Sequence, residues 1–308
     1  MSDLESLLKE AEHAGADVQK AVGDLYCNGM EPFQLRHGRT VASPDWPAAL
    51  KWYRLAAGQG SADAMHSIGQ CYLSGFGVKE DHAEAARWFR LAAENGSAEA
   101  KMRLAQCFEE GDGVRRERAA SSKWYRKAAE QLRKEAQQGD AKAQENLGFL
   151  YCDGKGVEKD AEKAEKWLVM AAEQGDPVMQ WGLGMKYESA LGIRQSYEEA
   201  VRWYRAAAEQ GLSIAQRFLG DMYDSGKGVP LNYTEASEWY RKAAEQGDPQ
   251  ARGYLYEMYS TGRGVEQSDA EAAKWKVMPG IFVPNDTGCS EEFIRALERL
   301  LVKKQCHE

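Results

Sequence analysis

Seven tryptophans recur along this chain at a nearly constant interval. Successive members are 36 residues apart, except for 43 between the third and the fourth, and they are Trp52, Trp88, Trp124, Trp167, Trp203, Trp239 and Trp275. A second aromatic series precedes the tryptophans by 16 residues, or by 26 in the first case, at Tyr26, Tyr72, Phe108, Tyr151, Tyr187, Tyr223 and Tyr259. A fixed period of this size is typical of a solenoid, in which each unit buries its apolar face against its neighbours. The spacing therefore predicts one continuous array of seven repeats.

Each repeat contains the signals of two helices joined by a glycine turn. A first helix is expected after Ser61 and after Asp140, Asp176 and Asp248, because these residue types cap helix N-termini. A Gly-x-Gly-Val turn follows, as at Gly75 to Val78, where glycine permits a left-handed exit from the helix. Seven residues before each tryptophan stands the expected cap of the second helix, at Asp45, Asp81, Glu117, Asp160, Ser196, Asn232 and Ser268, of which only Glu117 is a poor capping residue.

Departures from the repeat mark the ends and the irregular points of the array. We expect residues 1–15 to form a capping helix or half repeat, residues 16–278 the seven repeats, and residues 279–308 a linker and a C-terminal capping helix. Ten extra residues lie in the first turn, within Met30 to Pro44, and the 43-residue interval predicts a longer helix that includes Gln131 to Gln137.

Charge and composition narrow the class of protein. The net charge is −8 and there is no broad basic stripe, which argues against nucleic acid as a partner. No segment approaches the ~20 apolar residues of a membrane helix and no leader is evident, so we expect a cytoplasmic protein without membrane insertion. The six cysteines form no Cys-x-x-Cys pair and no metal-ligand spacing with histidines, so we expect reduced thiols, no metal and no cofactor.

The repeat motifs together resemble a known family. Their elements are Ala-x-x-x-Leu-Gly-x-x-Tyr, Gly-x-Gly-Val, Asp-x-x-x-Ala-x-x-Trp-Tyr and Ala-Ala-Glu-x-Gly, which are similar to the Sel1-like repeat, a relative of the tetratricopeptide repeat. The resemblance implies an all-α, right-handed superhelical solenoid whose first helices line a concave groove. It also implies a scaffold or adaptor in protein complexes, commonly in bacteria. Some secreted relatives hold each helix pair with a disulfide and are linked to penicillin binding, whereas this chain lacks paired cysteines within each repeat.

Motifs of catalytic type are better explained by the helical repeat. The Gly-x-Gly-Val turns follow helices, whereas a phosphate-binding fingerprint follows a strand and needs a third glycine. Ser6 and Lys9 match the Ser-x-x-Lys of penicillin-interacting enzymes, but no Lys-Thr-Gly accompanies them. We therefore expect a protein that is not an enzyme.

The expected groove has an apolar centre and an acidic rim. The centre consists of large apolar residues at first-helix positions that the fold does not require to be apolar, namely Phe149, Val178, Trp181, Met185 and Ile214. The rim consists of the carboxylates Glu109, Glu110, Asp153, Glu188, Asp221, Asp224 and Glu257. This pattern indicates a protein or peptide partner with an apolar anchor and basic flanks. The alternatives are that the apolar side chains pack on one another and that the carboxylates form a solvated face.

The leading hypothesis is thus a non-enzymatic scaffold that binds a partner protein in this groove. One alternative is an immunity or inhibitor protein for a co-encoded toxin, a purpose that some solenoids of the resembled family serve. A remote alternative is a hydrolase of the penicillin-interacting kind.

Overall fold

The computed structural model describes residues 11–27 and 44–276, which contain helices and no strand. In chain order the helices are α2 (Ala16–Cys27), α3 (Trp46–Gly58), α4 (Ala62–Ser74), α5 (His82–Glu94), α6 (Ala98–Glu110), α7 (Arg118–Gln137), α8 (Ala141–Asp153), α9 (Ala161–Ala172), α10 (Pro177–Ser189), α11 (Tyr197–Glu209), α12 (Ser213–Ser225), α13 (Tyr233–Glu245), α14 (Pro249–Thr261) and α15 (Asp269–Trp275). Most of the expected N-terminal capping helix, the long first turn and the C-terminal capping helix lie outside the described residues. The all-α prediction is confirmed for the part that is described.

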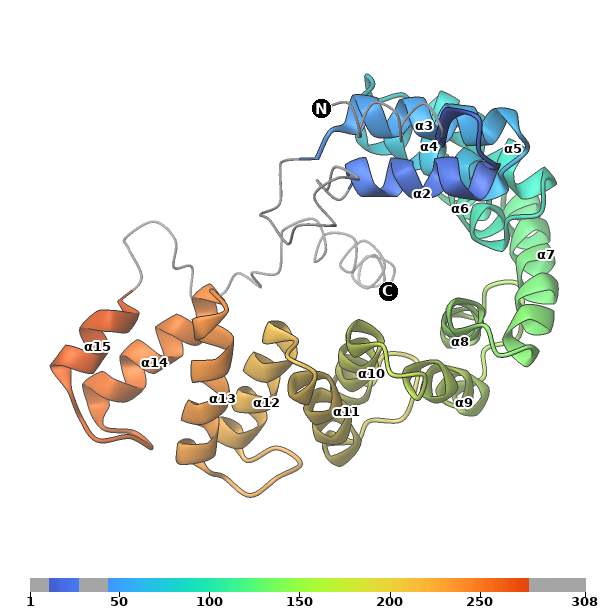
Figure 1. Cartoon of the computed structure of the whole chain (residues 1–308). Coiled ribbons are helices and arrows are strands. Elements are labelled where there is room, and N and C mark those ends of the chain that lie inside the picture. The colour runs from blue at the N-terminus through green and yellow to red at the C-terminus, as the bar shows by residue number, and fades with distance from the viewer. Residues whose placement is uncertain (1–10, 28–43, 277–308) are drawn as a thin grey trace. The chain divides into compact units, whose positions relative to one another are not determined.

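The chain divides into two compact units, Met1–Asp160 and Ala161–Glu308. Unit 1 contains α2 to α8 and unit 2 contains α9 to α15. Within each unit, successive helices form antiparallel hairpins that pack on their sequence neighbours (Figure 1). We call the first helix of each repeat its A helix (even numbers) and the second its B helix (odd numbers). Both units therefore show the helix-turn-helix repeat that the tryptophan period predicts.

Most of the predicted caps and turns form as expected in the part of the chain that is described. The Asp140 carboxylate accepts a hydrogen bond from the backbone N–H of Ala143 (2.6 Å), and Ser61 and Asp248 cap α4 and α14 in the same way. Glu117 makes no side-chain capping bond. The A helices α4, α6, α8, α12 and α14 each end at a glycine in the left-handed conformation. In α10 this place is taken by Ala190, at φ 56°, the single non-glycine residue with positive φ among those described.

Helix A and helix B of a repeat approach closely where helix A has a glycine. A Cβ atom added at Gly220 would lie 2.6 Å from the ring of Tyr240, and Gly184 meets Tyr204 at the same distance. The aromatic ring of helix B thus lies directly against the backbone of helix A. The prediction that these mid-helix glycines mark close helix packing is confirmed.

Buried glutamines join consecutive repeats. The Gln216 side chain, 5% exposed, donates to the carbonyl oxygen of Ala208 at the end of α11 (3.1 Å) and accepts from Gln246 at the end of α13 (2.8 Å). One side chain therefore links three helices and gives the Ala208 carbonyl, which also accepts from the backbone N–H of Gly211 (3.0 Å), a second donor. Gln19 and Gln180 make the same pair of bonds in their own repeats.

The long helix α7 introduces a step into unit 1. In the second, third, sixth and seventh repeats, the second turn glycine packs against the first residue of the preceding B helix, as Gly113 does against His82. In the fourth repeat, Gly156 packs instead against Tyr125, which lies seven residues beyond the start of α7. Seven residues are nearly two helical turns, so the same face of α7 is presented about 10 Å farther along. The extra residues therefore shift the next repeat along α7 without rotating it out of contact.

Candidate protein-binding face of unit 2

Several of the expected groove residues lie on the A helices of unit 2. Val178, Trp181 and Met185 follow one another at spacings of three and four residues on α10, and hence share one face of that helix. Ile214 takes the place of Val178 on α12. Val178 is 40% exposed, while Met185 and Ile214 are half-buried. These three apolar side chains remain accessible to a partner.

The expectation that Trp181 is an accessible anchor is wrong. Its side chain is 2% exposed and packs edge-on against Phe218 of the next A helix, with ring centroids 5.9 Å apart. The equivalent position on other A helices also faces the next repeat: Arg217 reaches Asp248 at the start of α14, and His66 reaches Glu99 of α6. This position therefore lies in the crevice between neighbouring A helices. The alternative interpretation, that Trp181 packs within the array, accounts for it.

Two half-buried aromatic residues of this face were not predicted. Phe218 on α12 contacts Trp181 and, at 5.3 Å between centroids, the ring of Tyr204. Tyr254 on α14 packs against Tyr240 at 4.7 Å. Both occupy the repeat position that α10 fills with Gly182. The large aromatic residues at this one position of the repeat are the feature of the sequence that could have predicted them. With Phe218, the accessible apolar surface continues from α10 onto α12.

A buried arginine connects the last two repeats of unit 2. The Arg217 side chain is 6% exposed, and its Nε lies 3.2 Å from the carboxylate of Asp248, which is also 6% exposed. The guanidinium lies over the Phe218 ring at 4.7 Å and is 3.7 Å from Asp221. A buried charge that has both an ion pair and an aromatic face is compensated internally, so we assign Arg217 to structure rather than to partner recognition.

Carboxylates of the expected rim are bonded to tyrosines of the B helices. Glu188 accepts from the Tyr204 hydroxyl (2.7 Å) and Asp221 from the Tyr240 hydroxyl (2.7 Å). Burial raises the pKa of Asp221 to about 6, although the Tyr240 hydrogen bond and the Arg217 charge act in the opposite direction. Burial, with the adjacent carboxylates, raises the pKa of both tyrosines. These two rim residues therefore satisfy buried hydroxyl groups as well as contributing negative charge.

The remaining rim residues of unit 2 differ in exposure. Asp224 pairs with Arg263 at 3.2 Å, and burial raises the pKa of its carboxyl, which the charge of Arg263 opposes. Glu257 on α14 is exposed. Of the rim on this unit, Glu257 is the most accessible carboxylate to a basic partner.

The other predicted groove residues belong to unit 1. Glu109 on α6 accepts from the Tyr125 hydroxyl (3.1 Å) and pairs with Lys155 (2.9 Å), and Glu110 is exposed. On α8, Phe149 is half-buried and Asp153 is exposed. The acid and tyrosine pairing thus occurs in both units. The second repeat, in which Phe89 has no hydroxyl, has Gln70 where α12 has Asp221.

Two buried cysteines of unit 1 are poor candidates for a reactive site. Cys71 and Cys107 are buried free thiols whose pKa values are raised by burial to about 11 and about 12, which makes them poor nucleophiles at neutral pH. Residues 11–27 and 44–276 contain no group of three His, Cys, Asp or Glu side chains placed to hold a metal ion. The helices of these ranges include none with the length and apolar character required to cross a membrane.

Comparisons with known proteins agree with this architecture. The Sel1 repeat family model matches residues 37–61, 62–97, 98–131, 141–176, 177–212, 213–248 and 252–275. The gap between the third and fourth matches falls on the extra residues of α7. A search of curated proteins found no match.

Two solved structures are similar over most of the chain. One is a protective antigen present in uropathogenic Escherichia coli strains, which displays an SLR fold, with 33% identity over 88% of this chain and 55% of that chain and a TM-score of 0.54. The chain thus spans about half the length of that relative. The other is a Sel1 repeat protein from Oxalobacter formigenes, with 34% identity over 75% of this chain and 91% of that one and a TM-score of 0.54. The repeated helix hairpins and these matches show that the chain belongs to the Sel1 repeat family.

Proposed function

We propose that this protein is a binding scaffold that holds a segment of a partner protein against α10 and α12 of unit 2. The observation that carries the proposal is the accessible apolar surface of Val178, Met185 and Ile214. The repeats of unit 1 place Asp63, Glu99 and Lys142 where α10 and α12 have Val178 and Ile214. Packing within the array does not require apolar side chains at these positions. Contact with a partner protein would explain why they are apolar.

The family supports the general form of this proposal. Sel1 repeat proteins are generally protein-interaction scaffolds, and their fold is typically not that of an enzyme. The finer features, an apolar anchor on the partner and basic residues beside it, rest on the side chains of this face. Val178, Met185 and Ile214 would contact the anchor, and Phe218 of α12, which packs against Trp181 of α10, would add apolar surface. Glu188 on α10, Asp224 on α12 and Glu257 on the neighbouring α14 would favour basic flanking residues.

Affinity capture with matched variants tests the proposal. Val178→Ser combined with Ile214→Ser should weaken capture of the natural partner by about 2 kcal/mol, the scale of an interface hot spot. Leu231→Ser is the control, because Leu231 is 56% exposed in the turn between α12 and α13, away from the A-helix face, and undergoes the same chemical change. The control should retain the wild-type partner. A partner retained by the double variant, or lost equally from the control, would exclude this face as the binding surface.

A further inference from the structure

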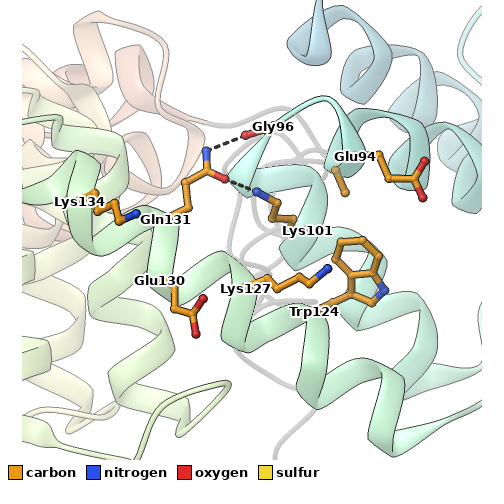
Figure 2. A pocket seen from close by; sticks show the side chains of 9 residues that line it. Glu94, Gly96, Lys101, Trp124, Lys127, Glu130, Gln131 and Lys134 are labelled. Carbon is orange, nitrogen blue, oxygen red and sulfur yellow. Dashed lines mark hydrogen bonds between the residues drawn. The ribbon is translucent and has the colours of Figure 1, made fainter.

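A hollow of about 580 Å³ lies on unit 1 beside the long helix α7 (Figure 2). Its lining comes from the end of α5, the start of α6 and one face of α7. The α7 face contributes Trp124, Lys127, Gln131 and Lys134, which recur at spacings of three and four residues and therefore form one stripe along the helix. Lys101 of α6 completes the lining opposite Gln131.

The hollow depends on the extra residues of α7. Gln131 donates to the carbonyl oxygen of Gly96 (2.6 Å), one of the three residues between α5 and α6, and α7 continues from there to Gln137. Lys134 lies on this extension and has no counterpart in the 13-residue B helices. Lys101 stands where four other repeats have the buried glutamine, and it donates to the Gln131 side chain (Figure 2). Lys101 and Lys134 are therefore specific to this repeat, whereas Lys127 has a counterpart in Lys242, which lies over the Trp239 ring.

The three lysines form a local concentration of positive charge on an acidic protein. Among the described residues, none of Lys101, Lys127 and Lys134 forms an ion pair with a carboxylate. Burial lowers the pKa of Lys101, which Glu135 opposes and the charge of Lys127 reinforces. Glu94 and Glu130 also line the hollow, and Figure 2 shows their carboxylates directed away from Gln131, while Glu135 accepts a hydrogen bond from the Gln131 side chain (2.7 Å). An anion placed among the ammonium groups would relieve their mutual repulsion.

The length and the composition of the lining indicate which kind of anion would fit the hollow. From Trp124 to Lys134 the stripe spans ten residues of helix, about 15 Å, which matches an extended peptide of about five residues. Lys127 lies over the Trp124 ring at 4.6 Å, so an apolar surface adjoins the cationic one. We propose that this hollow binds an acidic peptide segment of a second partner protein, with carboxylates on the three lysines and an apolar side chain against Trp124.

Binding of a labelled peptide to the full-length protein tests this assignment. The probe has two glutamates on each side of a phenylalanine and is followed by fluorescence anisotropy at low salt, where charge interactions are least screened. Lys134→Glu should weaken binding by about tenfold or more, whereas Arg126→Glu should change it by less than about twofold. Arg126 is a matched control because it is exposed on α7, lies outside the stripe and undergoes the same charge change. No binding of the probe at about 1 mM, or an equal loss in both variants, would overturn the proposal.

Two further measurements distinguish an acidic peptide from other molecules that could occupy the hollow. Citrate that displaces the peptide at equal concentration would show a site for small polycarboxylates and overturn the peptide assignment. Sedimentation that reveals a dimer abolished by Lys134→Glu would show that a second copy of this acidic chain occupies the hollow, which would also overturn it. Wild-type protein that stays monomeric and prefers the peptide to citrate supports the proposal.

Discussion

At the scale of single residues, Trp181 is buried between α10 and α12, where Phe218 packs edge-on against its ring. No other repeat has tryptophan, tyrosine or phenylalanine at this position. The sequence does not show whether the side chain points into the open groove or into the crevice between A helices, because this depends on how closely the next helix packs. Phe218, half-buried on α12, covers the Trp181 ring and decides the outcome.

Trp181→Ala should therefore destabilise the protein. Removal of a buried tryptophan typically costs about 3–5 kcal/mol, because apolar contacts are lost and a cavity remains. Val178→Ala, on the same face of α10 but 40% exposed, should cost less than about 1 kcal/mol. Urea unfolding followed by circular dichroism measures both values. Equal stability of the two variants would contradict the packing role of Trp181.

His66 should make folding sensitive to acid. Its side chain is 16% exposed and lies against Phe89, and burial lowers the pKa of His66 to about 4, with Glu99 opposing and Arg103, Lys20 and Lys142 reinforcing the shift. Between about pH 6.5 and pH 4 the unfolded chain then binds a proton that the folded chain does not. The contribution of His66 to stability is thus present above pH 6.5 and decreases as the pH falls through this window. Between pH 7 and pH 5 the loss should be on the order of 1–2 kcal/mol.

His82 provides a control of opposite sign. Hydrogen bonds from its ring to Asp112, and to Glu80, raise the pKa of His82, so its contribution is present at low pH and is lost as the pH rises. The unfolding free energies of His66→Gln and His82→Gln, compared with wild type across pH 5 to 7.5, should therefore diverge in opposite directions. A pH dependence unchanged by His66→Gln would show that this histidine titrates alike in both states.

At the scale of helices and turns, the sequence predicts most of the structure because each signal acts locally. Glycine at Gly226 ends α12 in a left-handed turn, and Asn232 caps α13, as their residue types require. The sequence predicts the length of the extra segment of α7, but it does not predict how this segment shifts the next repeat. That length follows from the 43-residue interval, whereas the shifted contact of Gly156 with Tyr125 depends on which face of α7 the next repeat meets.

Ala190 is the turn residue whose replacement should improve stability. It holds the left-handed conformation that five other A helices assign to glycine, which costs a residue with a Cβ atom roughly 1–2 kcal/mol. Ala190→Gly should stabilise the protein by about 1 kcal/mol after the added flexibility of the unfolded chain is subtracted. The reciprocal change Gly226→Ala should destabilise it by a similar amount, about 1 kcal/mol. Thermal unfolding measures both, and a destabilising Ala190→Gly would show that this turn is not strained.

At the scale of the whole molecule, the repeats distribute two kinds of surface over the two units. The accessible apolar residues lie on A helices of unit 2, and the cationic hollow lies against a B helix of unit 1. The repeat pattern marks the first set, because apolar residues stand out against polar ones in other repeats. The repeat pattern does not mark the cationic hollow, because Lys101 and Lys134 are far apart in the sequence and only the folded structure shows that they line the same hollow. One surface that favours apolar and basic residues and another that favours acidic residues would suit a protein that joins two partners.

Hydrogen exchange of the complex with a captured partner tests the central claim most directly. If the partner lies on the A-helix face of unit 2, peptides from Pro177–Ser189 and Ser213–Ser225 should exchange more slowly in the complex. Peptides from the B helices Tyr197–Glu209 and Tyr233–Glu245 should exchange at the rate of the free protein. Slower exchange confined to these B helices, or to unit 1, would contradict the account and place the partner on another surface.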